Sequence, residues 1–169
     1  MHKLLSKLVY ALARVAGLFV YKYPKSDSTA TTVLLLDGGT NTIVVERGRG
    51  PFTGWLAFPG GFLNVGTENL RQAARRELRE ETTIDLPIEL FRFVDQRSEP
   101  GRDPRGHVVD HGWLVVVPPE LRDYVVNTLV GKDDARGAFV KPVAELLASG
   151  MAFDHRELLV AALELAKRQ

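Results

Sequence analysis

Residues 68–82 constrain the fold more than any other segment, because they predict a long amphipathic helix with carboxylates on its buried face. At about 100° per residue, the apolar side chains of this segment share one face, which must pack against another element. The residues of this face are Leu70, Ala73, Ala74 and Leu78. Glu77 and Glu81 fall in the middle of the same face, and Glu80 lies at its edge. The helix therefore has to pack where another group balances its carboxylates.

These glutamates allow two interpretations. Ion pairs one turn apart, such as Arg76 with Glu80, would account for the outer side chains. They leave Glu77 and Glu81 without an arginine partner on the helix, and burying an unpaired carboxylate is strongly unfavourable. Hard oxygen ligands one turn apart are what Mg²⁺ or Mn²⁺ prefers. The pattern therefore favours a divalent-metal site, with Mg²⁺ as the expected ion and Mn²⁺ as an alternative.

The rest of the chain alternates predicted strands and helices, which indicates one α/β or α+β domain. Apolar, β-branched runs predict the strands, and Asp37-Gly38-Gly39 predicts a hairpin turn between the first two. The predicted strands are 31–36, 42–47, 90–94, 112–117 and 138–140, and the predicted helices are 68–82, 143–147 and 156–167. Residues 121–129 are compatible with either a helix or a strand. We assign 24–169 to a single domain, because no linker divides it.

Composition excludes several classes of protein. The sequence holds 22 Lys and Arg against 21 Asp and Glu, so its net charge of +1 gives no basis for a nucleic-acid partner. It holds no cysteine, which excludes disulfides, thiolate catalysis and cysteine zinc sites. Hydrophobic residues make up 45% and charged residues 25%, which is typical of a globular domain.

Residues 1–23 predict a separate amphipathic helix. Lys3, Lys7 and Arg14 share one helical face, and apolar side chains fill the other. Arg14 interrupts the apolar stretch, so no transmembrane span is expected. The helix can pack on the domain, on a partner subunit or on a membrane surface; a cleaved signal peptide is the less favoured reading. We expect a cytoplasmic homodimer, because a monomer would leave this apolar stripe exposed.

A glycine-rich loop precedes the carboxylate helix. Phe58-Pro59-Gly60-Gly61 places two glycines where the backbone can approach the helix closely. A carbonyl group there can face the carboxylates, whereas the simpler interpretation is an ordinary turn. The combination with Arg76-Glu77-Leu78-Arg79-Glu80-Glu81 makes the first interpretation specific.

With these two segments the chain resembles the Nudix hydrolase family. Residues 61–68 match the opening of the family motif, Gly-x5-Glu, except that one extra residue lies between Gly61 and Glu68. Residues 76–84 match its end, with Thr83 where the family usually has glycine. The resemblance implies an α/β/α sandwich with a mixed sheet, and hydrolysis of a nucleoside diphosphate linked to another moiety.

The resemblance also implies roles for individual residues. Glu77, Glu80 and Glu81 would hold Mg²⁺ together with the carbonyl group of Gly61. Arg76 would orient these glutamates, and Glu68 would be a structural or outer-shell residue. A metal between two phosphates neutralises developing charge and lowers the pKa of its bound water, so no covalent nucleophile is needed.

Two further segments resemble the ADP-ribose pyrophosphatase-like branch of the family. Arg102-Asp103-Pro104-Arg105-Gly106 lies in a predicted polar loop, where Arg102 and Arg105 would clamp phosphate oxygens. Ala152-Phe153-Asp154-His155 precedes the last predicted helix. Without the resemblance, these are a solvated turn and a helix cap. The resemblance favours ADP-ribose or a nucleoside diphosphate sugar as the small-molecule substrate.

Arg47 and Trp55 are further candidates for substrate contacts. Arg47, at the end of a predicted strand, would contact the pyrophosphate, and Trp55 would border the nucleobase. A surface cation and a core aromatic are the alternatives. For the general base we favour Asp134, in the pair Asp133-Asp134, over Glu99.

Three functions remain open from the sequence. The first is a Mg²⁺-dependent pyrophosphohydrolase of ADP-ribose-like substrates. The second is a Nudix hydrolase of another nucleotide, such as a dinucleotide, a dinucleoside polyphosphate or a nucleoside triphosphate. The third is a catalytically silent nucleotide-binding module, against which the complete glutamate set argues.

Overall fold

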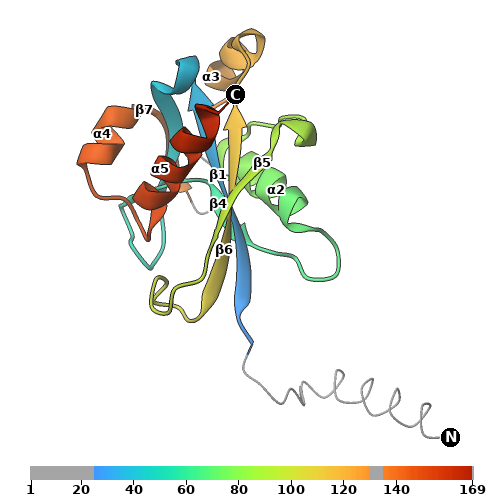
Figure 1. The fold of residues 1–169 in the computed structure, drawn as a ribbon, viewed down its shortest axis with the longest axis vertical. Coiled ribbons are helices and arrows are strands. Elements are labelled where there is room, and N and C mark those ends of the chain that lie inside the picture. The colour runs from blue at the N-terminus through green and yellow to red at the C-terminus, as the bar shows by residue number, and fades with distance from the viewer. Residues whose placement is uncertain (1–24, 130–134, 169) are drawn as a thin grey trace, which may run out of the picture.

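The computed structural model describes residues 25–129 and 135–168, and within them seven strands form one mixed sheet (Figure 1). The strands are β1 (Asp27–Leu36), β2 (Asn41–Arg47), β3 (Leu56–Ala57), β4 (Gly60–Phe62), β5 (Arg92–Arg97), β6 (Val108–Val116) and β7 (Ala135–Pro142). The helices are α2 (Leu70–Thr82), α3 (Arg122–Thr128), α4 (Val143–Ala148) and α5 (His155–Ala166). The helix predicted over residues 1–23 lies outside the described residues, as do Asp133 and Asp134.

Strand β1 is the centre of the sheet. It runs parallel to β6 and antiparallel to β2 and β4, while β5 extends the sheet beyond β6, and β3 and β7 both pair with β2. Short 3-10 turns connect several elements, at Asp37–Gly39, Ile88–Leu90 and Pro119–Leu121. The first of these turns joins β1 to β2, where the sequence predicts a hairpin.

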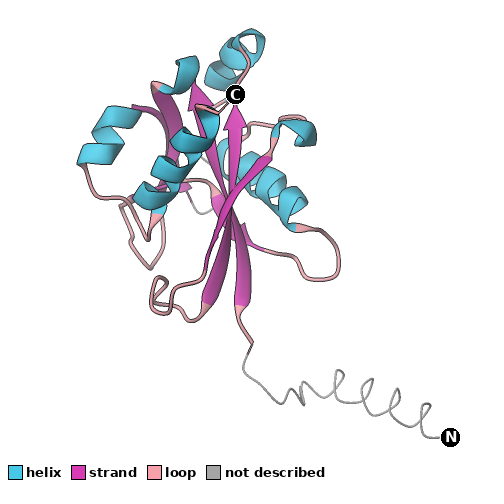
Figure 2. Cartoon of the chain, viewed as in Figure 1, coloured by secondary structure: helices cyan, strands magenta, loops and turns pink. Residues whose placement is uncertain are grey.

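Alternate side chains of β1 divide the core into two layers. Ala30, Leu34 and Leu36 pack with the buried face of α2, whereas Val33 and Leu35 pack with α4 and α5 on the other side of the sheet. Figure 2 shows the same order of layers, with α2 on one side of the strands and α4 and α5 on the other. The α/β/α sandwich with a mixed sheet, expected from the resemblance, is confirmed.

The predicted boundaries of three elements that form the site differ from the structure. Strand β1 begins at Asp27 rather than at residue 31 and so includes Thr29. Strand β6 begins at Val108 rather than at residue 112, because its parallel register with β1 runs from Asp27 with Val108 to Leu35 with Val116. Helix α2 begins at Leu70 rather than at residue 68, because Asn69 caps it and exchanges hydrogen bonds with Gln72.

Two ambiguous segments are also resolved. Residues 121–129, compatible with either a helix or a strand, contain the helix α3. The predicted loop before α2 contains the short strands β3 and β4. Strand β4 brings Gly60 and Gly61 beside β1, in register with Thr31 and Ala30. The glycine loop is therefore anchored to the centre of the sheet.

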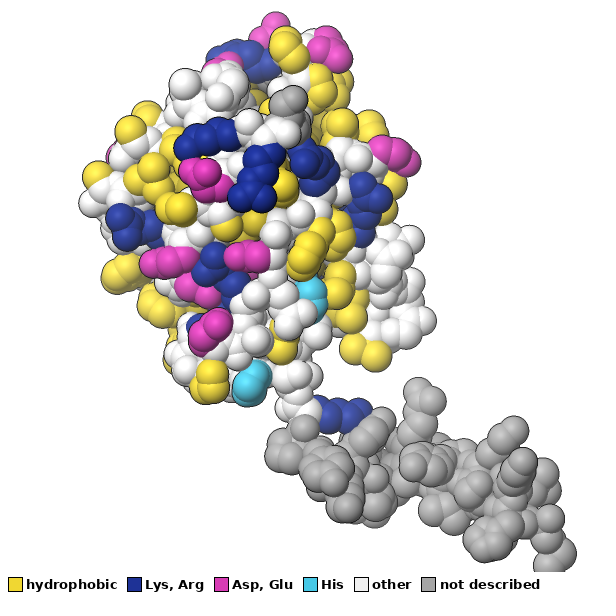
Figure 3. Space-filling view, viewed as in Figure 1, with side chains coloured by type: hydrophobic (Ala, Val, Ile, Leu, Met, Phe, Trp, Pro, Cys, Tyr) yellow, Lys and Arg dark blue, Asp and Glu magenta, His cyan; other side chains and the backbone are white. Residues whose placement is uncertain are grey.

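The described surface carries charges of both signs. On the face in Figure 3, Lys and Arg side chains lie interspersed with Asp and Glu side chains, with apolar side chains between them. In the part of the chain that the structure describes, no helix combines the length and the apolar character that crossing a membrane requires.

Candidate functional site

Arg76 is the centre of the carboxylate cluster on α2. Its guanidinium group donates hydrogen bonds to Glu68 at 2.7 Å, to Glu77 at 2.6 Å, to Glu80 at 2.9 Å and to the carbonyl oxygen of Phe62 at 2.9 Å. Hydrogen bonds to the carboxylates, foremost that of Glu68, raise the pKa of Arg76 above its usual value despite burial. Arg76 therefore remains charged and ties the middle of α2 to β4.

The extra residue before Glu68 does not prevent this contact. The Glu68 carboxylate accepts both from Arg76 and from the backbone N–H of Asn64, and its side chain is only 10% exposed. The hydrogen bond from Arg76 lowers the pKa of Glu68. The structure thus places Glu68 behind the helix carboxylates, against Arg76.

The prediction that Glu77 lacks an arginine partner on the helix is wrong. Neighbouring residues of a helix point about 100° apart. The long Arg76 side chain nevertheless carries several N–H donors, and one of them reaches Glu77. Glu81 instead accepts a hydrogen bond from the backbone N–H of Gly60 at 3.1 Å. Both carboxylates are therefore balanced by donors that the helical spacing alone did not show.

The Glu77 carboxylate lies directly against Gly61, where a side chain at position 61 would force it to move. A Cβ atom built on Gly61 would lie 2.4 Å from Glu77 Oε1, well inside van der Waals contact. Burial raises the pKa of Glu77 above its usual value, although the hydrogen bond from Arg76 acts in the opposite direction. The second glycine of the loop thus makes room for a half-buried carboxylate.

The residues fit a divalent cation by their chemistry. Glu77, Glu80 and Glu81 line one cavity of about 390 Å³ together with Gly60 and Gly61, and their oxygens are hard ligands. As they now point, no three acidic or His side chains of the described residues form a cluster that could hold a metal ion. A cation there would share these carboxylates with Arg76 and the Gly60 amide, because each carboxylate has two oxygens.

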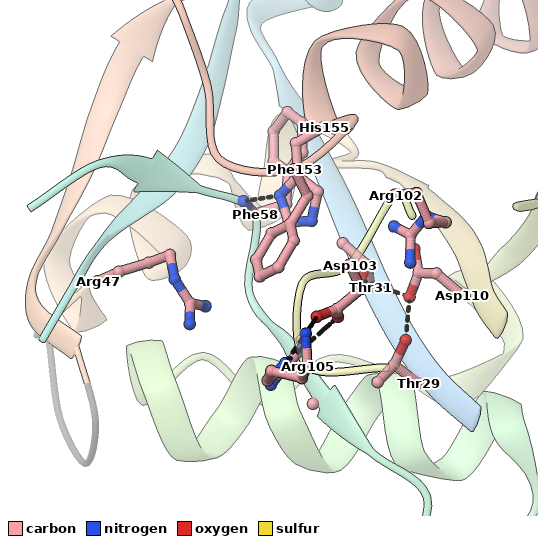
Figure 4. Close-up of a pocket in the computed structure, with 12 residues that line it drawn as sticks. Thr29, Thr31, Arg47, Phe58, Arg102, Asp103, Arg105, Asp110, Phe153 and His155 are labelled. Atoms are coloured by element: carbon pink, nitrogen blue, oxygen red, sulfur yellow. Dashed lines mark hydrogen bonds and ion pairs between the residues drawn. The ribbon is translucent and has the colours of Figure 1, made fainter. Parts of the chain in front are cut away.

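A smaller cavity of about 40 Å³ adjoins the carboxylate cavity (Figure 4). The two cavities share five lining residues, which are Arg47, Phe58, Gly60, Gly61 and Arg105. The smaller cavity is lined in addition by Thr29, Thr31, Arg102, Asp103, Asp110, Phe153 and His155. It lies on the α5 side of the sheet, because Thr29 and Thr31 share the face of β1 that carries Val33.

The two arginines of the predicted phosphate clamp have different surroundings. Arg102 is 7% exposed and makes two hydrogen bonds to the Asp154 carboxylate, one of them 2.9 Å long. Burial alone would raise the pKa of Asp154, but the hydrogen bond from Arg102 lowers it. Arg105 pairs with Asp103 at 2.7 Å and lines both cavities. Arg102 therefore anchors the loop to the start of α5, and Arg105 lies at the junction of the cavities.

Arg47 and Trp55 also differ in position. The guanidinium group of Arg47 lies 4.9 Å from the centre of the Phe153 ring, and Arg105 lies 5.4 Å from the same ring. Arg47 therefore belongs to the wall between the cavities. Trp55 is 48% exposed, packs edge-on against Phe52 and lines neither of the two cavities. The Phe153 ring therefore meets both arginines, and Arg105 also lies 4.8 Å from the centre of the Phe62 ring.

His155 is a site residue that the sequence analysis did not assign. Its Nδ1 accepts a hydrogen bond from the backbone N–H of Phe58 at 2.9 Å, and its ring stacks on the Phe58 ring. Burial lowers the pKa of His155 to about 4, so the ring is neutral near pH 7. Since Nδ1 is an acceptor, the neutral ring carries its proton on Nε2.

We expect the stability of the fold to fall as pH drops from about 7 to about 5 because of His155. An unfolded histidine has a pKa near 6.5, whereas that of folded His155 is about 4, so the unfolded chain takes up the proton first. The stabilisation is thus complete above about pH 6.5 and decreases by about 2 kcal/mol down to pH 5. Urea unfolding should show this slope in the wild type and a flatter one in His155→Gln. Equal slopes would contradict the assignment.

The comparisons with known proteins agree with this geometry. A family model described as NUDIX domain matches residues 27–161. The ADP-ribose pyrophosphatase of Methanocaldococcus jannaschii is 30% identical over 125 residues, which cover 74% of this chain and 67% of that protein. The ADPR responsive transcriptional repressor NtrR of Acinetobacter baylyi is 29% identical over 155 residues, or 83% of this chain and 56% of that protein. The chain thus spans about two thirds of the first relative and just over half of the second.

A solved structure has the same fold. The NUDIX domain of Shewanella oneidensis NrtR, crystallised with ADP ribose, aligns with a TM-score of 0.74 at 23% identity. The alignment covers 91% of this chain and 97% of that chain. At this level of identity the likeness concerns the fold.

Proposed function

The chain belongs to the NUDIX domain family, and from this premise we propose that it hydrolyses ADP-ribose or a related nucleoside diphosphate sugar. Its enzyme class is that of hydrolases acting on phosphoric anhydride bonds. The observation that carries the substrate proposal is the junction of a carboxylate cavity with an arginine-lined cavity. A pyrophosphate at this junction would meet the cation-binding carboxylates on one side and arginine side chains on the other. The named activity of the Methanocaldococcus jannaschii relative supports the same substrate class.

In this proposal the carboxylate cavity holds Mg²⁺ or Mn²⁺. Glu77, Glu80 and Glu81 would bind the cation together with the carbonyl group of Gly61, since all four line the cavity. When bound, the metal supplies charge neutralisation at phosphate oxygens and an acidified water for attack on phosphorus. Arg76 holds Glu77 and Glu80 in place from behind.

The arginines would bind the pyrophosphate. Arg47 and Arg105 each line both cavities, and they can neutralise phosphate oxygens by charge-assisted hydrogen bonds. Arg102 supports this arrangement through its ion pair with Asp154, which fixes the loop that carries Arg105. For the aromatic contact with the nucleotide we favour Phe153 over Trp55, because Phe153 lines the smaller cavity and Trp55 lines neither of the two.

We retain Asp134 as the candidate general base, with Asp133 beside it. Asp134 precedes Ala135 in the sequence, and Ala135 pairs with Arg47, whose side chain lines both cavities. Glu99, the other candidate, is exposed and lines neither cavity. We expect Asp134→Asn or Asp133→Asn to lower kcat by about 10²–10⁴-fold, with the acidic limb of the pH profile altered. Glu99→Gln is the matched control, and a change below about threefold in both aspartate variants would exclude this pair.

A substrate screen with Mg²⁺ tests the proposed function. The panel consists of ADP-ribose, UDP-sugars, NADH, dinucleoside polyphosphates and nucleoside triphosphates, with release of nucleoside monophosphate as the readout. We expect the highest kcat/KM for ADP-ribose or a nucleoside diphosphate sugar. A preference for triphosphates or dinucleoside polyphosphates would replace this proposal with the second hydrolase hypothesis.

A second candidate function rests on the similarity to the repressor. The Acinetobacter baylyi repressor is named as responsive to ADP-ribose. In this second proposal the present chain binds the nucleotide without hydrolysing it. The complete set of Glu77, Glu80 and Glu81 in one cavity favours catalysis. Calorimetric binding of ADP-ribose with no cleavage after prolonged incubation with Mg²⁺ or Mn²⁺ would instead favour the binding module.

A further inference from the structure

Asp110 carries a buried carboxylate of which one oxygen accepts hydrogen bonds and the other has no hydrogen-bond partner among the described residues. The residue is 1% exposed and lines the smaller cavity (Figure 4). Its Oδ1 accepts hydrogen bonds from the hydroxyl groups of Thr29 at 2.7 Å and Thr31 at 2.8 Å. Its Oδ2 is buried and has no hydrogen-bond partner among the described residues. Such an atom requires a donor that the described protein groups do not supply.

The surrounding strands hold Asp110 rigidly. Asp110 on β6 is in parallel register with Thr29 on β1, and Thr31 lies two residues further along the same face. Both threonines use their hydroxyl hydrogens on Oδ1, so the carboxylate cannot rotate without breaking two hydrogen bonds. Oδ2 is therefore held in one position, as a prearranged acceptor.

The chemistry of the cavity selects the kind of group that can bind there. Oδ2 of the ionised carboxylate only accepts hydrogen bonds, so the group that meets it must be a donor, and an ionised phosphate oxygen is not one. His155 lines the same cavity as a neutral ring with its proton on Nε2, which makes it a donor. A hydroxyl group both donates and accepts, so it suits this pair of side chains.

The cavity also lies in the right place relative to the proposed pyrophosphate position. Arg47 and Arg105 line both this cavity and the carboxylate cavity. The Arg105 side chain is 37% exposed, so it can shift to admit a ligand without unpacking the core. A substrate with phosphates between the arginines would present its adjoining sugar to Asp110.

We propose that Asp110 is a specificity-determining residue that accepts a hydrogen bond from a sugar hydroxyl of the substrate. This inference rests on the proposed function, and it adds that the chain recognises a sugar of the substrate as well as its phosphates. The hydroxyl can belong to the ribose of the nucleoside or to the second sugar. In either case the pairing favours a sugar-bearing diphosphate over a substrate that ends in a phosphate.

Substrate analogues test the proposal in the wild-type chain. ADP-ribose is compared with 2′,3′-dideoxy-ADP-ribose, which lacks both free hydroxyls of the nucleoside sugar, and with the β-methyl ester of ADP, which lacks the second sugar. We expect one analogue to lose about 10- to 100-fold in kcat/KM and in calorimetric Kd, because a carboxylate hydrogen bond is lost. The analogue that loses affinity identifies the sugar. Equal values for all three compounds would overturn the proposal.

Asp110→Asn tests the residue itself, with Asp123→Asn, the same change at an exposed aspartate of α3 outside both cavities, as the matched control. Asn at this position replaces the Oδ2 acceptor with a donor, so the preference for ADP-ribose over the affected analogue should shrink to within about threefold. Asp123→Asn makes the same chemical change away from the cavities, so its preference should remain that of the wild type. If Asp110→Asn is folded but weakens ADP-ribose and both analogues equally, Oδ2 holds only a structural water and the proposal fails.

The same measurements separate this inference from the proposed function. If the wild type cleaves none of the compounds, the proposed hydrolysis fails, and the Kd values still decide whether Asp110 reads a hydroxyl. If the wild type cleaves all compounds equally well, the hydrolysis stands and the role of Asp110 fails. Should Asp110→Asn not fold, the comparison of wild-type Kd values among the three compounds alone decides.

Discussion

Glu77→Gln is expected to lower kcat by about 10²–10⁴-fold, because it removes a charged oxygen from the proposed cation site. Glutamine keeps the shape that fits against Gly61, where a Cβ atom would not fit. It also keeps an acceptor for Arg76, which now donates to Glu77 Oε1. The measurement is kcat at saturating Mg²⁺, together with calorimetric titration of Mg²⁺ or Mn²⁺ into the folded variant.

The fold should tolerate this change. Burial raises the pKa of Glu77, and a group with a raised folded pKa loses its stabilising contribution as pH rises through that value. Near pH 7 the ionised side chain is therefore an unfavourable part of the metal-free fold, and a neutral amide removes that cost. Urea unfolding at pH 7 should accordingly show no large loss of stability.

Two variants complete the test of the cation site. Glu81→Gln should behave like Glu77→Gln, since Glu81 lines the same cavity. Glu157→Gln, which alters an exposed glutamate of α5, is the matched control and should leave kcat unchanged. A variant at position 77 or 81 that kept wild-type kcat and metal affinity would remove that glutamate from the site.

The fold could be predicted from sequence where local patterns determine it. The apolar stripe of Leu70, Ala73, Ala74 and Leu78 predicted α2 within two residues, because helical periodicity depends only on neighbours. Strand β6 was predicted to begin four residues too late, since Asp110 and His111 interrupt the apolar residues and the preceding loop is polar. Only the parallel partner β1, far away in the sequence, makes this segment a strand.

The residues of the candidate site likewise fall into those that local spacing could predict and those that depend on long-range contacts. The glutamates of α2 and the glycines before them lie within one short segment, so their spacing was informative. The partners of Arg102 and His155 are 52 and 97 residues away, and no spacing rule connects them. Asp110 was hidden for a further reason, because a carboxylate in a predicted polar loop gives no sign that it is buried. Long-range pairing therefore had to come from the structure.

Arg76→Ala is expected to reduce both metal affinity and kcat, by about 10- to 100-fold, although Arg76 is assigned no direct contact with the cation. The guanidinium group holds Glu68, Glu77 and Glu80 together, and without it three carboxylates repel one another at the start of the site. Arg75→Ala is the matched control on the neighbouring residue. It removes only the ion pair with Asp85, whose partners are 39% and 38% exposed, and such pairs contribute at most about 1 kcal/mol.

A pH profile distinguishes positioning by Arg76 from a general loss of stability. The hydrogen bond from Arg76 lowers the pKa of Glu77 against the effect of burial, so its removal lets that pKa rise further. A larger fraction of Glu77 is then protonated at a given pH, and the acidic limb of kcat should move to higher pH in Arg76→Ala. Arg76→Lys restores the charge without the fork of donors and should recover the position of the limb only in part. Loss of the orientation of the carboxylates must change how they bind protons and cations. If kcat fell in Arg76→Ala while the acidic limb of the pH profile and the metal affinity stayed unchanged, Arg76 would therefore be needed for the fold alone.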